Sequence, residues 1–283
     1  MKRWDIAFRR KITAWCLRFP VYFSAFFTGF VAVLITSYIL VRGIPNLKPE
    51  LFSLVYNSEN VSLLAPLVNS FLSALLALLI AVPAGVFSAV YLVEYSKKGS
   101  KLVKIVRLTS ETLSGIPSIV YGLFGMLFFV TTLGLGMSLL SGVFTLAIMV
   151  LPLIMRTTEE ALLAVPDSYR EGSFGLGAGR LGTVIKIVLP AAVPGILSGV
   201  ILAAGRIIGE TAALIYTAGT VPQFAFNPEL SARTLAVHLY VLSGEGQHMN
   251  ESYAVAVVLL ALVLVINTIS YAVARKIRGG QGE

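Results

Sequence analysis

The sequence is poor in charge and almost free of cysteine. Only 13% of its 283 residues are charged, against about 25% in a typical soluble domain, and 57% are hydrophobic. This balance excludes a soluble globular protein and indicates that lipid surrounds most of the chain. The single cysteine, Cys16, excludes an intrachain disulfide. Neither GxxxxGKS nor GxxxxGKT occurs, so the chain lacks a phosphate-cradling loop for ATP and we expect no cofactor on it.

Six apolar runs are candidates for membrane-spanning helices. They cover approximately residues 21–41, 64–92, 116–132, 142–155, 191–218 and 253–273. The first would extend roughly 31 Å as a helix, enough to cross a bilayer. A cleavable signal sequence is the alternative for this run, but signal cores are only about 7–15 residues long. We therefore predict an all-α polytopic membrane protein with six transmembrane helices.

Lysine and arginine are distributed unevenly between the polar segments. Six crossings place 18 of the 22 basic residues on the side of both termini and three on the other, with Arg206 inside a span. Cytoplasmic loops of membrane proteins carry the excess of positive charge, so we expect both termini in the cytoplasm of a cell-membrane protein. The net charge of +8 then sets the topology, and no nucleic-acid partner is expected.

The segment 171–190, EGSFGLGAGRLGTVIKIVLP, is polar and lies between two apolar runs on the predicted cytoplasmic side. A connector of about thirty residues with its own helix indicates a soluble partner. We expect one short helix that Pro190 ends before the fifth span. An ordinary amphipathic connector is the alternative. The residues that carry the pattern are Glu171, Gly172, Ser173, Gly177, Ile187, Leu189 and Pro190.

Two charged residues lie inside the fifth apolar run. Arg206 and Glu210 are four residues apart, which would place them on one helix face where they could pair. A charge at the centre of a bilayer costs roughly 2.5–3.5 kcal/mol and usually marks a pathway. A guanidinium suits an oxyanion, because its planar fork donates two parallel hydrogen bonds. The alternative is a structural ion pair that fixes helix packing.

Other patterns favour different functions, but their context argues against them. Residues 177–182 satisfy GxGxxG, yet no strand precedes them as a dinucleotide site requires. His238 and His248 have no metal-ligand spacing, and we expect both to be neutral surface residues. No predicted span holds a Ser/His or Asp/Asp pair, so an intramembrane enzyme is disfavoured.

Several stretches resemble known transport proteins. The spacing in 171–190 is similar to the EAA loop, through which ABC importer permeases contact their ATPases. Three further stretches, SGIPSIVYGLFG (114–125), MRTTEEALLAVP (155–166) and GRIIGETAAL (205–214), resemble the phosphate-specific permeases of the PstA type, as does SARTLAVHLYVLS (231–243). The likeness covers roughly residues 64–275. It departs from the family at Ala213, where proline is frequent.

The resemblance implies a type I (MetI-like) permease fold and ATP-driven import of inorganic phosphate. It also implies a sister permease (PstC), two ATPase subunits (PstB) that bind ATP and magnesium, and a phosphate receptor (PstS). The family's functionally implicated charges fall on Arg156, Arg206 and Glu210, although Arg156 could instead be a membrane-interface anchor. A related permease for phosphonate, sulfate, molybdate or an amino acid is the alternative.

These observations predict a simple domain organisation. Residues 1–63 would form a cytoplasmic tail, the first span and a polar external connector. Residues 64–275 would form the permease core, and residues 276–283 a cytoplasmic tail.

Overall fold

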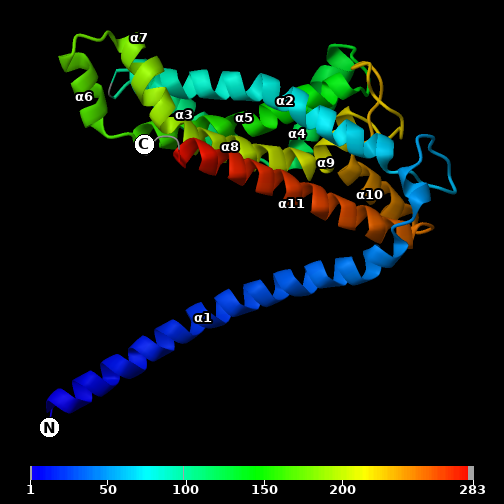
Figure 1. Cartoon of the computed structure of the whole chain (residues 1–283), viewed down its shortest axis with the longest axis horizontal. Coiled ribbons are helices and arrows are strands. Elements are labelled where there is room, and N and C mark those ends of the chain that lie inside the picture. The colour runs from blue at the N-terminus through cyan, green and yellow to red at the C-terminus, as the bar shows by residue number, and fades with distance from the viewer. Residues whose placement is uncertain (1, 98, 280–283) are drawn as a thin grey trace.

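The computed structural model describes residues 2–97 and 99–279, and every regular element within them is helical. The longer helices are α1 (Lys2–Gly43), α2 (Leu64–Val90), α3 (Lys101–Ser114), α5 (Leu139–Leu163), α8 (Leu189–Ile208) and α11 (Met249–Gly279). The shorter helices are α4 (Ser118–Gly125), α6 (Asp167–Gly175), α7 (Arg180–Thr183), α9 (Ala212–Thr217) and α10 (Leu235–Glu245). π-Helical segments follow α2, α4 and α7, and two short 3₁₀ turns follow α1. The arrangement confirms the predicted all-α class (Figure 1).

Small residues bring the helices of the central bundle together. A Cβ on Gly85 of α2 would come within 2.8 Å of Ile154 on α5, and one on Gly195 of α8 within 2.6 Å of Ala161. Ala77 and Ala81 of α2 are buried in the same cluster. Lipid tails are as apolar as the side chains, so the hydrophobic effect does not drive membrane helices together. Van der Waals contact between closely packed backbones stabilises their association instead.

Five single helices are long and apolar enough to span a membrane, and one bent pair brings the number to six. The pair is Lys101–Ser114 with Ser118–Thr132, bent by 102°. The predicted third span, 116–132, coincides with the second half of this pair, which is either one broken span or a re-entrant loop. The predicted fourth span was too short, since α5 runs from Leu139 to Leu163.

Helix α1 lies apart from the bundle along most of its length (Figure 1). The apolar part of this helix has none of its residues buried within the chain. Among the described side chains of α1, packing is tightest at its end: Tyr38 contacts Tyr253 of α11 edge to face, and Gly43 lies directly against the Tyr253 backbone. The body of α1 is therefore left for lipid or for another subunit to cover.

The predicted polar connector after α1 packs against the bundle. Leu51, Val61 and Leu63 are almost fully buried against Leu235 and Ala254 of α10 and α11. The sequence did not indicate this packing, because these apolar residues are isolated among polar neighbours and show no periodicity. The connector closes the end of the bundle opposite α6 and α7 (Figure 1).

His238 of α10 is fully buried at this closed end, so the expectation of a surface histidine was wrong. Its Nε2 lies 3.1 Å from the Val61 carbonyl and its Nδ1 lies 3.3 Å from Arg233 Nη1. Burial, and secondarily the positive charge of Arg233, lower the His238 pKa from 6.5 to about 4. His238 is therefore neutral at physiological pH and joins the connector to α10.

The predicted C-terminal tail, 276–283, lies partly outside the described residues. Helix α11 continues through residue 275 to Gly279, and residues 280–283 are not described. The end of α11 lies at the same end of the bundle as α6 and α7 (Figure 1).

Candidate coupling loop and transport path

The predicted partner-binding segment forms a two-armed loop, residues 167–188, at one end of the bundle. One arm is α6 (Asp167–Gly175), and the other is α7 with the π-helical segment Val184–Val188. Gly177 joins them with a φ of +81°, a conformation that costs a residue with a Cβ about 1–2 kcal/mol. The prediction of one helix for 171–190 was therefore wrong, because Gly177 reverses the chain within it.

Pro190 does not end a helix, contrary to the prediction. A continuous helix runs from Arg180 to Ile208, and Pro190 lies in the first turn of α8 within it. The preceding residues are π-helical, with each N–H reaching one residue further back than in an α-helix. This local widening is the usual way in which a helix accommodates a residue that lacks an N–H group. Ile187 and Leu189 accordingly belong to the second arm and its continuation into the membrane.

The tips of both arms expose large apolar side chains. Leu176 is 91% exposed, Leu181 64% and Phe174 49%. Glu171, Gly172 and Gly177 are exposed beside them, and a Cβ on either glycine would meet nothing within 4 Å. Helices α6 and α7, which carry the tips, lie at one end of the bundle (Figure 1). Apolar side chains gathered in this way mark a protein-binding surface.

Arg170 fixes the first arm to the bundle, a role that sequence analysis missed. Its guanidinium donates to the Glu94 carboxylate at 2.7 Å, and to the carbonyls of Val165 and Leu162 at 2.8 and 2.9 Å. A further bond reaches Asp167 at 3.2 Å. The side chains of Arg170 and Glu94 are only 14% and 9% exposed. Glu94 is 76 residues away in sequence, so no local pattern announces the pair.

The second arm has its own attachments. The Arg180 guanidinium lies over the Tyr95 ring, 5.2 Å from its centroid. The hydroxyls of Ser173 and Thr183 are 2.8 Å apart and join the two arms. Ser173, which the sequence assigned to the partner-binding pattern for its small size, therefore also holds the loop in shape.

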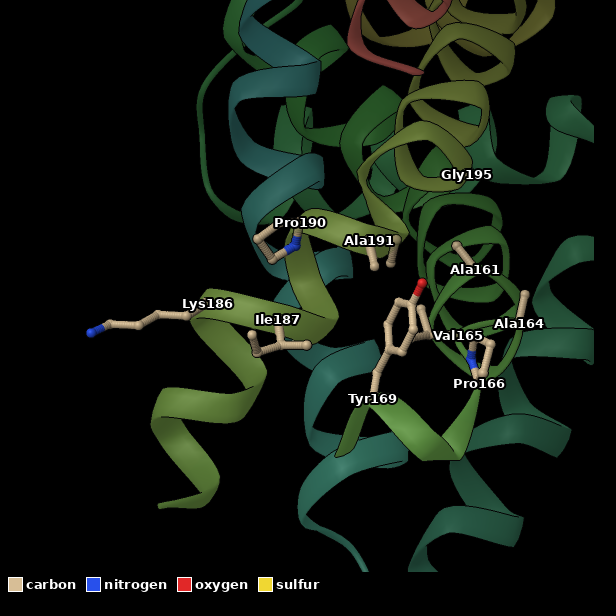
Figure 2. Close-up of a pocket in the computed structure, with 11 residues that line it drawn as sticks. Ala161, Ala164, Val165, Pro166, Tyr169, Lys186, Ile187, Pro190, Ala191 and Gly195 are labelled. Atoms are coloured by element: carbon tan, nitrogen blue, oxygen red, sulfur yellow. The ribbon is translucent and has the colours of Figure 1, made fainter. Parts of the chain in front are cut away.

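A groove of about 570 Å³ separates the first arm from the start of α8 (Figure 2). Tyr169 extends into it from α6, Ile187 and Pro190 line the facing side, and Lys186 points away (Figure 2). Ala161 and Ala191 supply small surfaces at its inner end. The groove leaves α6 separated from α8 on this side, and the Arg170 bonds attach α6 to the bundle from another side.

Two interruptions between helices lie deeper in the bundle. The chain is non-helical at residues 115–117, between α3 and α4, and at residues 209–211, between α8 and α9. Helices α4 and α9 touch, since a Cβ on Gly122 would lie 2.8 Å from the Cα of Ala213. Tyr121, just before this contact, lies in the same buried cluster as Ile207 and Ile208, which follow Arg206 in α8. Broken helices at membrane depth are tolerated only where they are buried in protein or line a cavity, as in transporters.

Arg206 and Glu210 do not form the predicted pair. Helix α8 ends at Ile208, so Glu210 lies beyond the face that Arg206 occupies. The buried Glu210 carboxylate instead accepts a hydrogen bond from the Ala213 N–H at 3.2 Å and so caps α9. A proline at position 213 would have no N–H to donate to it. Arg206 is half-buried, and no hydrogen bond or ion pair of its side chain is found among the described residues.

Arg156 lies apart from Arg206. It is paired with Glu160 at 3.1 Å on an exposed face of α5, beside the Arg107–Glu159 pair that joins α3 to α5. Gly199 of α8 is level with Thr157 of α5, so Arg206 lies about 10 Å further along the bundle. The structure therefore does not bring the three predicted charges together. Across the described residues, no group of three metal-ligating side chains is present.

Comparisons with known proteins agree with this architecture. Residues 81–279 match the family described as "Binding-protein-dependent transport system inner membrane component". The "Probable ABC transporter permease protein YqgI" of Bacillus subtilis is 36% identical over 250 residues, covering 82% of this chain and 84% of that one. The "Phosphate transport system permease protein PstA" of Haemophilus influenzae is 34% identical, covering 81% and 82%.

A solved structure of the MetNI methionine ABC transporter in an inward-facing conformation superimposes with a TM-score of 0.59. It is 22% identical and covers 85% of this chain and 96% of that one, so it supports the fold alone. The family match extends over more than two thirds of the chain. The chain is thus a multi-pass membrane permease with the MetI-like importer fold, and it belongs to the binding-protein-dependent transport system inner membrane components.

Proposed function

We propose that this chain is a permease subunit of an ATP-driven importer of inorganic phosphate. The relatives named as phosphate permeases support the cargo, and one of them is 34% identical over 81% of this chain. The observation that carries the proposal is Arg206, whose side chain has no hydrogen bond or ion pair among the described residues and which precedes Ile207 in the cluster that holds Tyr121. A guanidinium without a counter-ion in an apolar bundle is poised for an anion that arrives from outside.

Phosphate suits this site because of its charge and shape. The Arg206 fork can donate two parallel hydrogen bonds to one tetrahedral oxyanion. Glu210 is held away by the Ala213 N–H, so it does not neutralise Arg206 in the observed state. Arg156 lies nearer the two-armed loop than Arg206 and would contact phosphate later on the path. In the observed state it is paired with Glu160.

Movement is supplied from outside the chain. In the proposal, two ATPase subunits bind ATP and magnesium and grip the exposed side chains of the two-armed loop, Phe174, Leu176 and Leu181. A sister permease forms the other half of the path, and a receptor delivers phosphate to the opposite face. The loop and both termini then lie in the cytoplasm, an orientation that the distribution of lysine and arginine supports.

The test is uptake of radiolabelled phosphate by the complete complex in proteoliposomes. Removal of charge-assisted hydrogen bonds worth about 1.5–3 kcal/mol should lower uptake by R206Q about 10- to 100-fold. R42Q is the matched control, since Arg42 lies over Tyr38 at the end of α1, far from the path. Undiminished uptake by R206Q would remove Arg206 from the mechanism. A wild-type complex that imports another oxyanion but not phosphate would refute the cargo.

A further inference from the structure

The end of α2 is held by both arms of the loop at two consecutive residues. Arg170 of the first arm forms the buried ion pair with Glu94. Arg180 of the second arm stacks on Tyr95. Glu94 and Tyr95 close the π-helical segment Tyr91–Tyr95 that continues α2. The loop is therefore tied to a span to which its backbone is not connected.

We expect that arginine is needed at position 170, because its guanidinium bonds to groups at the ends of two helices, α5 and α2. It donates to the carbonyls of Leu162, in the last turn of α5, and of Val165, just beyond the end of that helix. It also neutralises Glu94, a carboxylate at the unfavourable C-terminal end of α2. A lysine ammonium has three donors on a flexible stem and cannot reproduce this planar set of bonds.

The attachment leads directly into the core of the bundle. Val90, at the end of α2, and Leu92, in the π-helical segment after it, lie in one buried cluster. The same cluster holds Leu162, in the last turn of α5, and Val165, just beyond that helix. Val188 and Ala192, where the second arm enters α8, lie in the same cluster. A displacement of α6 that moved Glu94 would therefore move α2, α5 and α8 together.

We propose that the Arg170–Glu94 pair is the joint that transmits movement of the two-armed loop to α2. This inference rests on the proposed function, because it assumes that ATPase subunits move the loop. The pair positions the spans and touches neither cargo nor nucleotide. Without it, α6 would move on its backbone hinges beside the open groove while α2 stayed in place. ATP hydrolysis would then continue with little transport.

The test measures phosphate imported per ATP hydrolysed by the complete complex in proteoliposomes. E94Q keeps the shape of the side chain but removes the buried counter-ion of Arg170 and leaves it only the exposed Asp167 carboxylate, so this ratio should fall at least about tenfold. E94D retains the charge and should keep the ratio within about threefold of the wild type. R170K should resemble E94Q, because it keeps the charge but loses the fork.

E159Q is the matched control. Glu159 is also a buried carboxylate paired with an arginine between helices, but its partner Arg107 lies on α3 and not in the loop. Its loss should change uptake and hydrolysis together and leave their ratio unaltered. Assembly is checked for each variant by co-purification with the ATPase subunits.

Each outcome decides a different point. An unchanged ratio in assembled E94Q and R170K complexes would overturn the joint. An equal fall in E94Q and E159Q would reduce the pair to a general structural role and also overturn it. A wild-type complex without phosphate uptake would instead refute the proposed function, which separates the two failures.

Discussion

Gly177 gives the sharpest test of the loop geometry, because its backbone conformation can be tested separately from the space around it. Its φ is +81°, and a Cβ placed there would meet nothing within 4 Å. Substitution by alanine therefore causes no steric clash and acts only through the backbone. The left-handed conformation costs an L-residue about 1–2 kcal/mol. That energy corresponds to a factor of about 5–30 in an equilibrium constant.

The measurement is the affinity of the ATPase subunits for the membrane-embedded chain. G177A should weaken binding by up to about 30-fold, because only the native loop conformer binds. G177N should lie close to the wild type, since asparagine tolerates positive φ better than other residues. G179A is the matched control, because Gly179 has an ordinary φ of −74° and equally open surroundings. Equal affinities for G177A and G179A would refute the reasoning.

Two further predictions concern stability. The neutral, buried His238 should make the chain less stable as pH falls from 6.5 towards 4, by about 3 kcal/mol in total, because the unfolded state binds the proton first. Thermal unfolding at pH 7.5 and 5 should show this loss in the wild type and less of it in H238Q; identical pH dependence would contradict it. G122A should cost about 1–3 kcal/mol by forcing a Cβ against the Ala213 backbone, whereas G115A, with no atom closer than 3.5 Å, should cost little. Equal melting temperatures for these two variants would count against the contact between α4 and α9.

The crossings were predictable from sequence because apolar length is a local property. Hydropathy alone identifies the run that becomes α2, and the polar residues around Glu171 and Gly177 identify the loop. Family resemblance singled out Arg206, whose isolation in an apolar run is also visible in the sequence. These features depend on neighbouring residues along the chain and not on tertiary contacts.

The ion pairs between segments and the interruptions within helices were not predictable, because they depend on contacts between residues far apart in the sequence. The interruption at residues 209–211 contains no proline, and Glu210 caps α9 only because the chain breaks there. Pro190 suggested a helix end, but a π-helical turn accommodates it. Glu94 reads as an ordinary connector charge until Arg170 is placed against it. His238 reads as a loop residue until the connector covers it.

One cross-linking experiment tests the central claim that ATPase subunits grip the two-armed loop. Leu176 is the most exposed apolar residue of that surface, and Cys16 can be replaced by serine to leave L176C as the only thiol. A short thiol-directed photo-cross-linker on L176C should join the chain to an ATPase subunit in the assembled complex. The same reagent on A178C would report contact range along the loop. Adducts with the ATPase would support the account, and their complete absence in an active complex would contradict it.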